Sequence, residues 1–269
     1  MAVMAPVVVL LFLFVYTALY HNLVTRQYTV TSPKLDGVEP IRIVSLTDLH
    51  SYTYGSDQQP LIQRVKALDP DVICLVGDIA DWVYPISGVE QLLDGIMDIA
   101  PCLYVTGNHE YWSDIEAYRA LFARYGLTVL DNEAVALDIK GQRIMFYGLD
   151  DPEYARAQEY GKFLGQMPPV DTGMFNVLLA HRPDPIELYS QYGFDLVLSG
   201  HAHGGQVRIP FILNGLFAPD EGWFPKYAGG LYDVNGTHMV VSRGLSYYRQ
   251  LPRVFNPPEV VCVTIQGEK

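Results

Sequence analysis

Eight short apolar segments recur along this chain and restrict its fold more than any other feature. They are nearly continuous in apolar residues, as β-strands covered on both faces are. They lie at residues 41–46, 71–77, 102–107, 143–149, 175–180, 194–200, 238–242 and 260–265. Helix-like segments separate several of them, at residues 57–68, 88–99, 113–125 and 183–192. This alternation predicts a layered α/β domain over residues 41–269.

Composition excludes several classes of protein. Apolar residues make up 49% of the 269 residues and charged residues only 18%, which supplies a sizeable core and excludes disordered, collagen-like and coiled-coil chains. The formal net charge of −12 opposes binding to nucleic-acid backbones and anionic lipid surfaces unless a bound cation reverses the local field. No nucleic-acid partner is therefore expected. Cys74, Cys102 and Cys262 stand singly in apolar runs, which indicates core residues and neither disulfides nor a zinc cluster.

The N-terminal segment is different in kind. Residues 2–20 contain no charge, and a helix over these 19 residues would measure about 28 Å, close to the ~30 Å hydrocarbon core of a bilayer. We therefore predict an uncleaved transmembrane anchor over residues 1–22. A cleaved signal peptide is an alternative, although no basic residue precedes the run and no Ala-x-Ala follows it. A buried core helix is a second alternative.

Residues 23–40 are predicted to be a polar linker, because they contain a Ser-Pro turn signal and few apolar residues. The expected location is the membrane, with a single N-terminal pass. Arg26 and Lys34 follow the apolar run and favour a cytoplasmic main domain, but two charges leave the side of the membrane open. We expect a monomer.

Metal-ligating side chains directly follow five of the apolar segments. Ligands of α/β proteins collect at the carboxyl ends of the strands, so these side chains are expected at one edge. The D-x-H and H-x-H spacings place two side chains on one side of an extended segment. Carboxylate, imidazole and amide donors without thiolate suit Mn²⁺, Fe, Zn²⁺ or Co²⁺. The seven candidate ligands are Asp48, His50, Asp78, Asn108, His181, His201 and His203.

Seven ligands are too many for one ion. With one bridging carboxylate, they provide four contacts to each of two divalent ions. Two such ions and two aspartates leave a local charge of about +2, which would attract an anionic phosphate ester to an acidic protein.

The order and content of these motifs resemble the calcineurin-like metallophosphoesterase superfamily, whose pattern is D-x-H, G-D, G-N-H-[DE], a lone H and G-H-x-H. All five blocks occur in order between Ile41 and His203. The resemblance implies a four-layer α/β/β/α sandwich with two central sheets flanked by helices. It also implies a metal-dependent phosphoric ester hydrolase with two divalent ions.

The same resemblance implies a role for each site residue. The first metal would be held by Asp48, His50, Asp78 and His203, and the second by Asp78, Asn108, His181 and His201, with Asp78 bridging. A metal-bridged hydroxide would attack phosphorus. His109 would bind the phosphate and protonate the leaving oxygen, oriented by Asp81. A turn residue is the alternative for Asp81. For Glu110, the open choices are a hydrogen bond behind the ligands, a helix start, or a part in the chemistry.

One departure from the superfamily narrows the function. Its protein phosphatases continue the second block as G-D-x-x-D-R-G, whereas Trp82 and Val83 follow Asp81 here. Because the substrate-gripping arginine is absent, we do not expect protein-phosphatase activity. The C-terminal tail and the N-terminal apolar run resemble the membrane-associated bacterial branch of small metallophosphoesterases.

The Pro/Gly-rich stretch 210–230 is crowded with apolar side chains. It is either a loop pinned to the core or an apolar wall that faces the bilayer and accepts a lipid-linked group. These residues are Phe211, Ile212, Leu213, Leu216, Phe217, Trp223 and Phe224. Arg243 and Lys226 are candidates for an extra phosphate contact, with ordinary ion pairing as the alternative.

The leading interpretation is a membrane-anchored dinuclear phosphoesterase that hydrolyses phosphodiester, phosphomonoester or pyrophosphate bonds of a small or lipid-linked substrate. A nuclease with the same site is an alternative, against which the acidic composition and the lack of a basic, aromatic-interleaved patch argue. A non-catalytic metal-binding scaffold is another, but such a protein could lose ligands, and here the set is complete.

Overall fold

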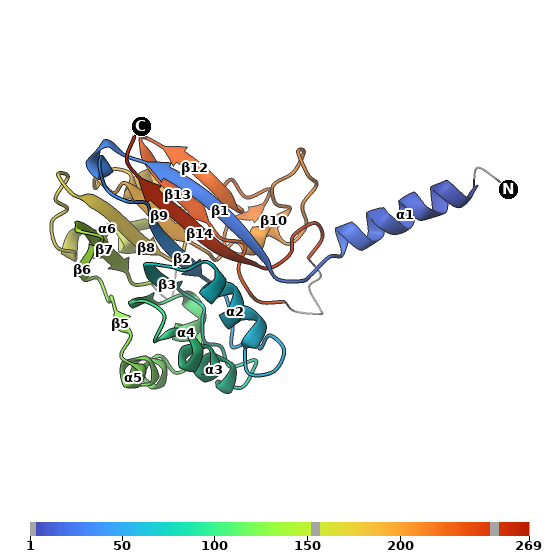
Figure 1. Ribbon diagram of the computed structural model, residues 1–269, viewed down its shortest axis with the longest axis horizontal. Helices are drawn as coiled ribbons and strands as arrows, with labels where there is room; N and C mark the ends of the chain where they lie inside the picture. Colours follow the sequence, from blue (N-terminus) through green and yellow to red (C-terminus); the bar gives the residue numbers. More distant parts are fainter. Residues whose placement is uncertain (1–3, 152–156, 248–252, 269) are drawn as a thin grey trace.

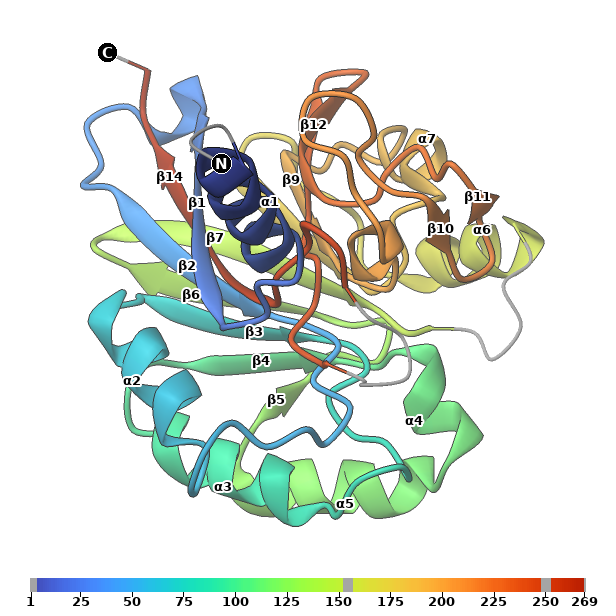
Figure 2. The same ribbon diagram turned by 90° about the vertical axis from the view of Figure 1, so that its right-hand side faces the viewer.

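Two six-stranded β-sheets lie face to face at the centre of the protein, as the computed structural model shows (Figure 2). It describes residues 4–151, 157–247 and 253–268. The first sheet has the order β1 (Val24–Thr31), β14 (Glu259–Gln266), β2 (Ile41–Leu46), β3 (Val72–Val76), β4 (Cys102–Val105) and β5 (Thr128–Val129). The second has the order β12 (Gly230–Val234), β13 (Thr237–Val241), β9 (Leu196–Ser199), β8 (Phe175–Ala180), β7 (Gln142–Leu149) and β6 (Ala134–Ile139).

Helices cover the outer faces of both sheets. The first sheet is covered by α2 (Gln59–Ala67), α3 (Ser87–Ile96) and α5 (Ile115–Tyr125), and the second by α6 (Ala157–Gln166) and α7 (Ile186–Tyr189). One buried apolar cluster fills the space between the sheets, and another lies under each helical layer. The predicted mixed α/β fold is therefore confirmed, with its layers in the order helix, sheet, sheet, helix. Shorter elements are η1 (Pro33–Leu35), α4 (Asn108–Trp112), η2 (His203–Gly205), β10 (Phe217–Ala218) and β11 (Gly222–Trp223).

All eight predicted strands are present, and the further strands of the two sheets are their outer strands, β1, β5, β6 and β12. The structure differs from the predicted linker at residues 24–31. This segment forms β1, which pairs in parallel with β14 from Val24 opposite Glu259 to Thr31 opposite Gln266. Its polar side chains are compatible with a strand because β1 is an edge strand with one exposed face.

Parallel strands bring the sequence motifs to one edge of the molecule. In the first sheet β2, β3 and β4 run in parallel, and in the second sheet β7, β8, β9 and β13 do. The antiparallel strand β14 lies between β1 and β2. The loops that leave β2, β3, β4, β8 and β9 can therefore converge.

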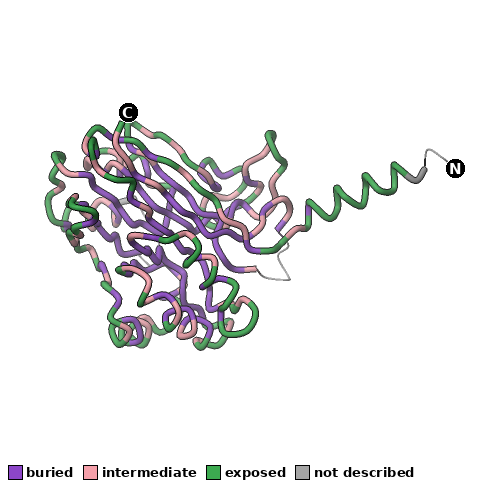
Figure 3. Tube along the Cα trace, in the orientation of Figure 1, coloured by how far each residue is buried: buried purple, intermediate pink, exposed green. Residues whose placement is uncertain are grey.

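The N-terminal helix α1 (Met4–Ala18) projects away from the body of the protein (Figure 1). Its apolar side chains are exposed along most of its length (Figure 3), for example Phe12 at 68%. Near its end, Phe14 packs edge-on against Phe255, and the Phe255 N–H donates to the Ala18 carbonyl at 2.7 Å. Across the described ranges, no helix is long and apolar enough to cross a membrane. The predicted transmembrane helix is therefore not supported, since the 15 residues of α1 span only about 22 Å.

Candidate metal centre

All seven predicted ligands lie together at the edge where the parallel strands end. Six are at most 2% exposed, and the side chain of His203 is 12% exposed. Two clusters have ligand atoms within 4.8 Å of one another. One consists of Asp48, His50 and His203, and the other of Asp78, His181 and His201. These clusters match three of the four residues that the sequence assigned to each metal ion.

The backbone at the ligands is unusual. Five of the seven adopt a left-handed conformation with φ between 47° and 65°, namely Asp48, His50, Asp78, His201 and His203. Such values are uncommon for residues other than glycine and cost about 1–3 kcal/mol each, so they persist where the surrounding structure fixes them. They turn the chain sharply just beyond each strand. Gly244 packs close beneath, because a Cβ there would lie 2.7 Å from the Cβ of Asp48.

The donor atoms that face the centre suit divalent cations. The Nδ1–H of His181 donates to the Val76 carbonyl at 2.9 Å, which leaves Nε2 directed at Asp78 Oδ2, 3.2 Å away. A histidine held this way through its other nitrogen is typical of metal ligands. The buried Oδ1 of Asn108 accepts no hydrogen bond within the described part of the chain. The residues therefore fit two divalent ions.

The protonation states agree with this fit except at His181. Burial would lower the pKa of His181, but Asp78 and Asp48 outweigh burial and raise the pKa to about 10, so a metal ion bound there would displace a proton. Burial would raise the pKa of Asp78, but His181 and His50 outweigh burial and hold the pKa well below its usual range. Burial lowers the pKa of His201 to about 4 and that of His203 to about 3, so both imidazoles are neutral near pH 7. Ionised carboxylates and neutral imidazoles are the forms that coordinate metal.

Glu110 is a fully buried clamp between two of the ligand loops. Its carboxylate accepts hydrogen bonds from four backbone N–H groups, those of Asp78 at 3.0 Å, Ile79 at 2.7 Å, Ala80 at 3.1 Å and Gly107 at 2.9 Å. Of the roles left open from the sequence, the structure shows the hydrogen bonds behind the ligands and the helix start in α4. The clamp fixes the loop after β3 relative to the loop after β4.

His109 and Asp81 lie in direct contact beside the clusters. Asp81 Oδ2 is 2.9 Å from Nδ1 of His109 and also 2.9 Å from Nδ1 of His50. The His109 side chain is 26% exposed. Burial would lower its pKa, but the hydrogen bond with Asp81 and the charge of Asp78 outweigh burial and raise the pKa above its usual value. The contact with His50 was not anticipated from the sequence.

Three further residues were missed by sequence reasoning. Arg182, 2% exposed, donates through Nε to Asp151 at 2.9 Å and through Nη1 to Asp220. Arg182 Nη1 and Asp220 Oδ2 lie 3.1 Å and 3.3 Å from His201 Nε2. Arg182 follows a predicted ligand, and Asp151 follows β7, so the argument from strand ends could have found both. Asp220 lies in a distant loop and carries no such signal.

The two candidates for an extra phosphate contact lie elsewhere. Lys226 pairs with Glu187 at 2.7 Å on the surface, 70% exposed, as the ordinary alternative expected. Arg243 is buried, pairs with Glu259 at 3.0 Å and belongs to a neighbouring cavity.

Several large apolar side chains of the stretch at residues 210–230, after η2, do not pack in the core. Phe211 is fully exposed, and Ile212, Trp223 and Phe224 are 82%, 67% and 66% exposed, so these side chains are not held in the core.

Comparison with known proteins agrees with the geometry. Residues 41–205 match the family model described as calcineurin-like phosphoesterase. The chain is 29% identical over 262 residues to the uncharacterized metallophosphoesterase YkuE of Bacillus subtilis (strain 168), covering 92% of this chain and 87% of that protein. It is 29% identical over 252 residues to an uncharacterized metallophosphoesterase of Aquifex aeolicus (strain VF5), with coverage of 90% and 92%. It is 29% identical over 242 residues to the phosphodiesterase YaeI of Escherichia coli (strain K12), with coverage of 86% and 84%.

Proposed function

The chain belongs to the calcineurin-like phosphoesterase family, and we propose that its metal centre hydrolyses phosphodiester bonds of a small or lipid-linked substrate. That it is a metal-dependent phosphoesterase follows from the family and from the clustered aspartates and histidines. The observation that carries the proposal is the convergence of seven candidate ligands at one edge, six of them buried, with His109 beside them.

The ligand assignment from the sequence is retained as part of the proposal. One ion is held by Asp48, His50, Asp78 and His203, and the other by Asp78, Asn108, His181 and His201. Divalent ions bound there supply electrophilic assistance to the phosphoryl group. The mixed donor set suits ions of the class of Mn, Fe, Zn and Co and does not choose among them.

His109 is the proposed proton donor. Its Nδ1 is occupied by Asp81, so Nε2 is the nitrogen that can give a proton to the departing oxygen. The raised pKa of His109 favours the protonated form that this step requires. Asp81 is a positioning residue in this scheme, because it holds the ring and stabilises its positive charge.

Phosphodiesters are favoured over monoesters for two reasons. Trp82 and Val83 stand where related protein phosphatases carry their substrate-gripping arginine. The relative YaeI is described as a phosphodiesterase. A lipid-linked leaving group is supported by the exposed aromatic side chains of residues 211–224.

We place the protein at a membrane surface, attached through α1. The support is the exposure of its apolar side chains, such as Leu10 at 66% and Phe12 at 68%, which would be stabilised by burial in lipid. Tyr16 and Tyr20 near the end of the helix suit the interface between lipid and water.

Metal reconstitution of the full-length protein tests the catalytic proposal. Chelator-treated protein should be inactive, and adding back Mn²⁺, Co²⁺, Zn²⁺ or Fe²⁺ should restore about two ions per chain and turnover. The substrates are bis-p-nitrophenyl phosphate, p-nitrophenyl phosphate and single-stranded DNA. His238→Ala is the control for losing a histidine outside the metal centre, because His238 lies on β13 and pairs with Asp233 at the surface.

Each outcome of the reconstitution decides between functions. Faster turnover of the diester than of the monoester supports the proposal. Preferred cleavage of DNA would favour the nuclease alternative. Full metal occupancy without turnover on any ester would favour the scaffold, and activity of the metal-free protein would exclude the metal mechanism altogether.

A further inference from the structure

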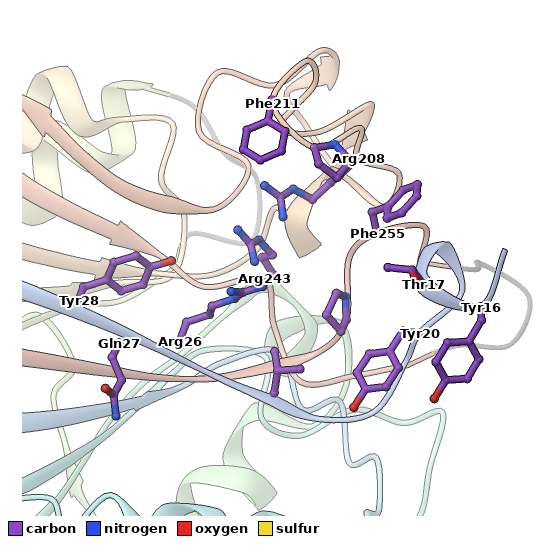
Figure 4. A pocket seen from close by; sticks show the side chains of 13 residues that line it. Tyr16, Thr17, Tyr20, Arg26, Gln27, Tyr28, Arg208, Phe211, Arg243 and Phe255 are labelled. Atoms are coloured by element: carbon purple, nitrogen blue, oxygen red, sulfur yellow. The ribbon is translucent and has the colours of Figure 1, made fainter. Parts of the chain in front are cut away.

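A cavity of about 800 Å³ opens beside the base of α1 (Figure 4), and none of the seven candidate metal ligands lines it. Its lining includes three arginines, which come from separate parts of the chain. Arg26 belongs to β1, Arg208 to the loop after η2, and Arg243 to the segment after β13. Aromatic side chains complete the lining, among them Tyr16 and Phe211.

The cavity has more arginine side chains than carboxylates that pair with them. Arg243 Nη1 donates to Glu259 Oε2 at 3.0 Å, and Arg26 Nε lies 3.7 Å from the same oxygen. Arg208 instead donates to the backbone oxygen and to Oδ1 of Asn214, at 2.8 Å and 2.7 Å. In the described ranges, two of the three guanidinium groups thus share the buried carboxylate of Glu259, and Arg208 is neutralised by no ion pair. The cavity carries a local excess of positive charge in a protein whose net charge is −12.

One arginine that lines the cavity also has a donor that is enclosed and unsatisfied. Arg243 is only 7% exposed, and its Nε makes no hydrogen bond to any described residue. Leaving a buried donor unpaired costs about 1–3 kcal/mol, and more when the group is charged. Burial lowers the pKa of Arg208, and the charge of Arg243 lowers it further. An anion in the cavity would relieve this crowding of positive charge.

Apolar surfaces flank the arginines on two sides. The exposed helix α1 forms one, and the exposed ring of Phe211 forms the other. A ligand that satisfies both surfaces carries a negative group joined to hydrocarbon. We propose that the cavity binds the phosphate headgroup of an anionic membrane phospholipid, with the acyl chains along α1. The inference rests on the proposed attachment of α1 to a membrane.

The cavity is separate from the metal centre although the chain connects them. Arg243 lines the cavity, while the next residue, Gly244, packs against Asp48. The Leu245 N–H donates to the Thr47 carbonyl at 3.0 Å and closes the wall between them. The proposed lipid is accordingly a membrane ligand, held beside the catalytic centre, and need not be the substrate.

Vesicle binding of the full-length protein tests the proposal. Vesicles of phosphatidylcholine alone are compared with vesicles that also contain phosphatidylglycerol, by flotation at physiological salt. The wild type should prefer the anionic vesicles. Arg26→Gln and Arg208→Gln should each weaken this preference by about fivefold, the usual share of one basic side chain near an anionic surface, and leave binding to phosphatidylcholine unchanged.

The matched control is Arg143→Gln. Arg143 is exposed, lies on β7 and pairs with Asp138, so its removal makes the same change in net charge outside the cavity. The control should keep the wild-type preference. Equal weakening in the control would mean that net charge alone acts, and this would overturn the proposal. Melting temperature and turnover of a soluble diester are measured for every variant, and both should match the wild type.

Two further measurements on the wild type keep the test independent of folding defects. A phosphatidylglycerol with a photoactivatable acyl chain should form adducts on the last turn of α1 or near Phe211, and adducts confined to other regions would contradict the assignment. Glycerol 3-phosphate without vesicles should not raise the melting temperature. If it does so in the wild type but not in Arg208→Gln, the cavity takes a free phosphate and not a lipid.

The outcomes also separate this proposal from the proposed function. A wild type that binds neither vesicle refutes membrane attachment and the lipid site together. Equal binding to both vesicles refutes only the lipid site. Absence of diester turnover by the metal-loaded wild type would refute the catalytic proposal and would not affect the conclusions from the vesicle experiments.

Discussion

The metal centre and the arginine cavity lie on neighbouring strands, yet they gather opposite charges. Asp48 follows β2, Glu259 begins β14 and Arg26 lies on β1, which are three adjacent strands of the first sheet. Around the end of β2, in the metal centre, lie carboxylates and imidazoles that backbone groups hold in place. On the other side of β14, in the arginine cavity, lie guanidinium groups and aromatic rings next to α1. One sheet edge thus carries the candidate metal ligands and the arginine cavity on three adjacent strands.

The two regions also differ in how firmly they are held. The ligand loops are fixed by the Glu110 clamp and by the close approach of Gly244 to Asp48. The arginine cavity opens to exposed apolar residues on α1 and after η2. We therefore expect substitutions in the metal centre to change catalysis with little effect on membrane binding, and substitutions on α1 to do the reverse.

Asp78→Ala should produce the largest effect. It removes the carboxylate that lies 3.2 Å from His181 Nε2 and 3.7 Å from His50 Nε2, and that is the proposed bridge between the ions. We expect both ions to be lost and turnover to fall to that of metal-free protein, with vesicle binding retained. Elemental analysis and a diester assay measure this. An active variant with full metal content would show that Asp78 is not a bridge.

His109→Ala should leave the ions in place and slow hydrolysis by roughly 10²–10⁴-fold, the usual share of a positioned general acid. The loss should be greater for alkyl esters, whose alkoxides need a proton, than for p-nitrophenyl esters, whose phenolate leaves unaided. Comparing kcat/KM for the two ester types checks this. Equal slowing would argue against proton donation, and loss of metal would place His109 among the ligands.

Asp81→Asn should affect both His109 and the metal. Since Asp81 contacts Nδ1 of His50 as well as Nδ1 of His109, the variant should weaken metal affinity by roughly 10–100-fold, as loss of a carboxylate behind a ligating histidine does. Chelator competition measures the affinity. At saturating metal the alkyl ester should remain slowed, but less than in His109→Ala. Unchanged affinity would show that the contact with His50 is not part of the metal site.

Phe12→Ser should have the smallest effect, and only on membrane binding. The lost burial of one aromatic side chain is worth about 1.5 kcal/mol at the low end of its range, or roughly tenfold in partition. Binding to both vesicle types should fall equally, because the substitution removes no charge. Flotation and the diester assay of the same preparation check this. A fall in turnover would mean that α1 contributes to the catalytic site.

The contrast between inner and outer strands explains what the sequence could predict. The eight strands predicted from apolar runs are covered on both faces or nearly so, and that burial is what makes their sequences continuous. β1, by contrast, has one exposed face and carries Thr25, Arg26 and Gln27 in its first half, so its composition resembles a linker. Its strand pairing is decided by β14, more than two hundred residues away, which no local pattern reveals.

The metal centre likewise contains features that the sequence could predict and features that it could not. The convergence of the candidate ligands that follow strands was predictable, because strand ends converge in any parallel sheet. The role of Glu110 was left open, since its four hydrogen bonds depend on how the loop after β3 folds over α4. Asp220 reaches His201 from a loop without a motif. The hydropathy run also could not show that α1 ends at Ala18, where the chain begins to pack on the domain.

The direct connection between α1 and β1 has a mechanical consequence. The helix ends at Ala18 and β1 begins at Val24, at the side of the molecule from which α1 projects (Figure 1). The component of a force on α1 that acts along β1 would load the strand against the parallel neighbour to which all eight of its residues are matched. In this shearing geometry the ladder hydrogen bonds carry the load together, whereas a peeled hairpin would lose them one at a time. Drag from a moving membrane would therefore be resisted by the whole strand.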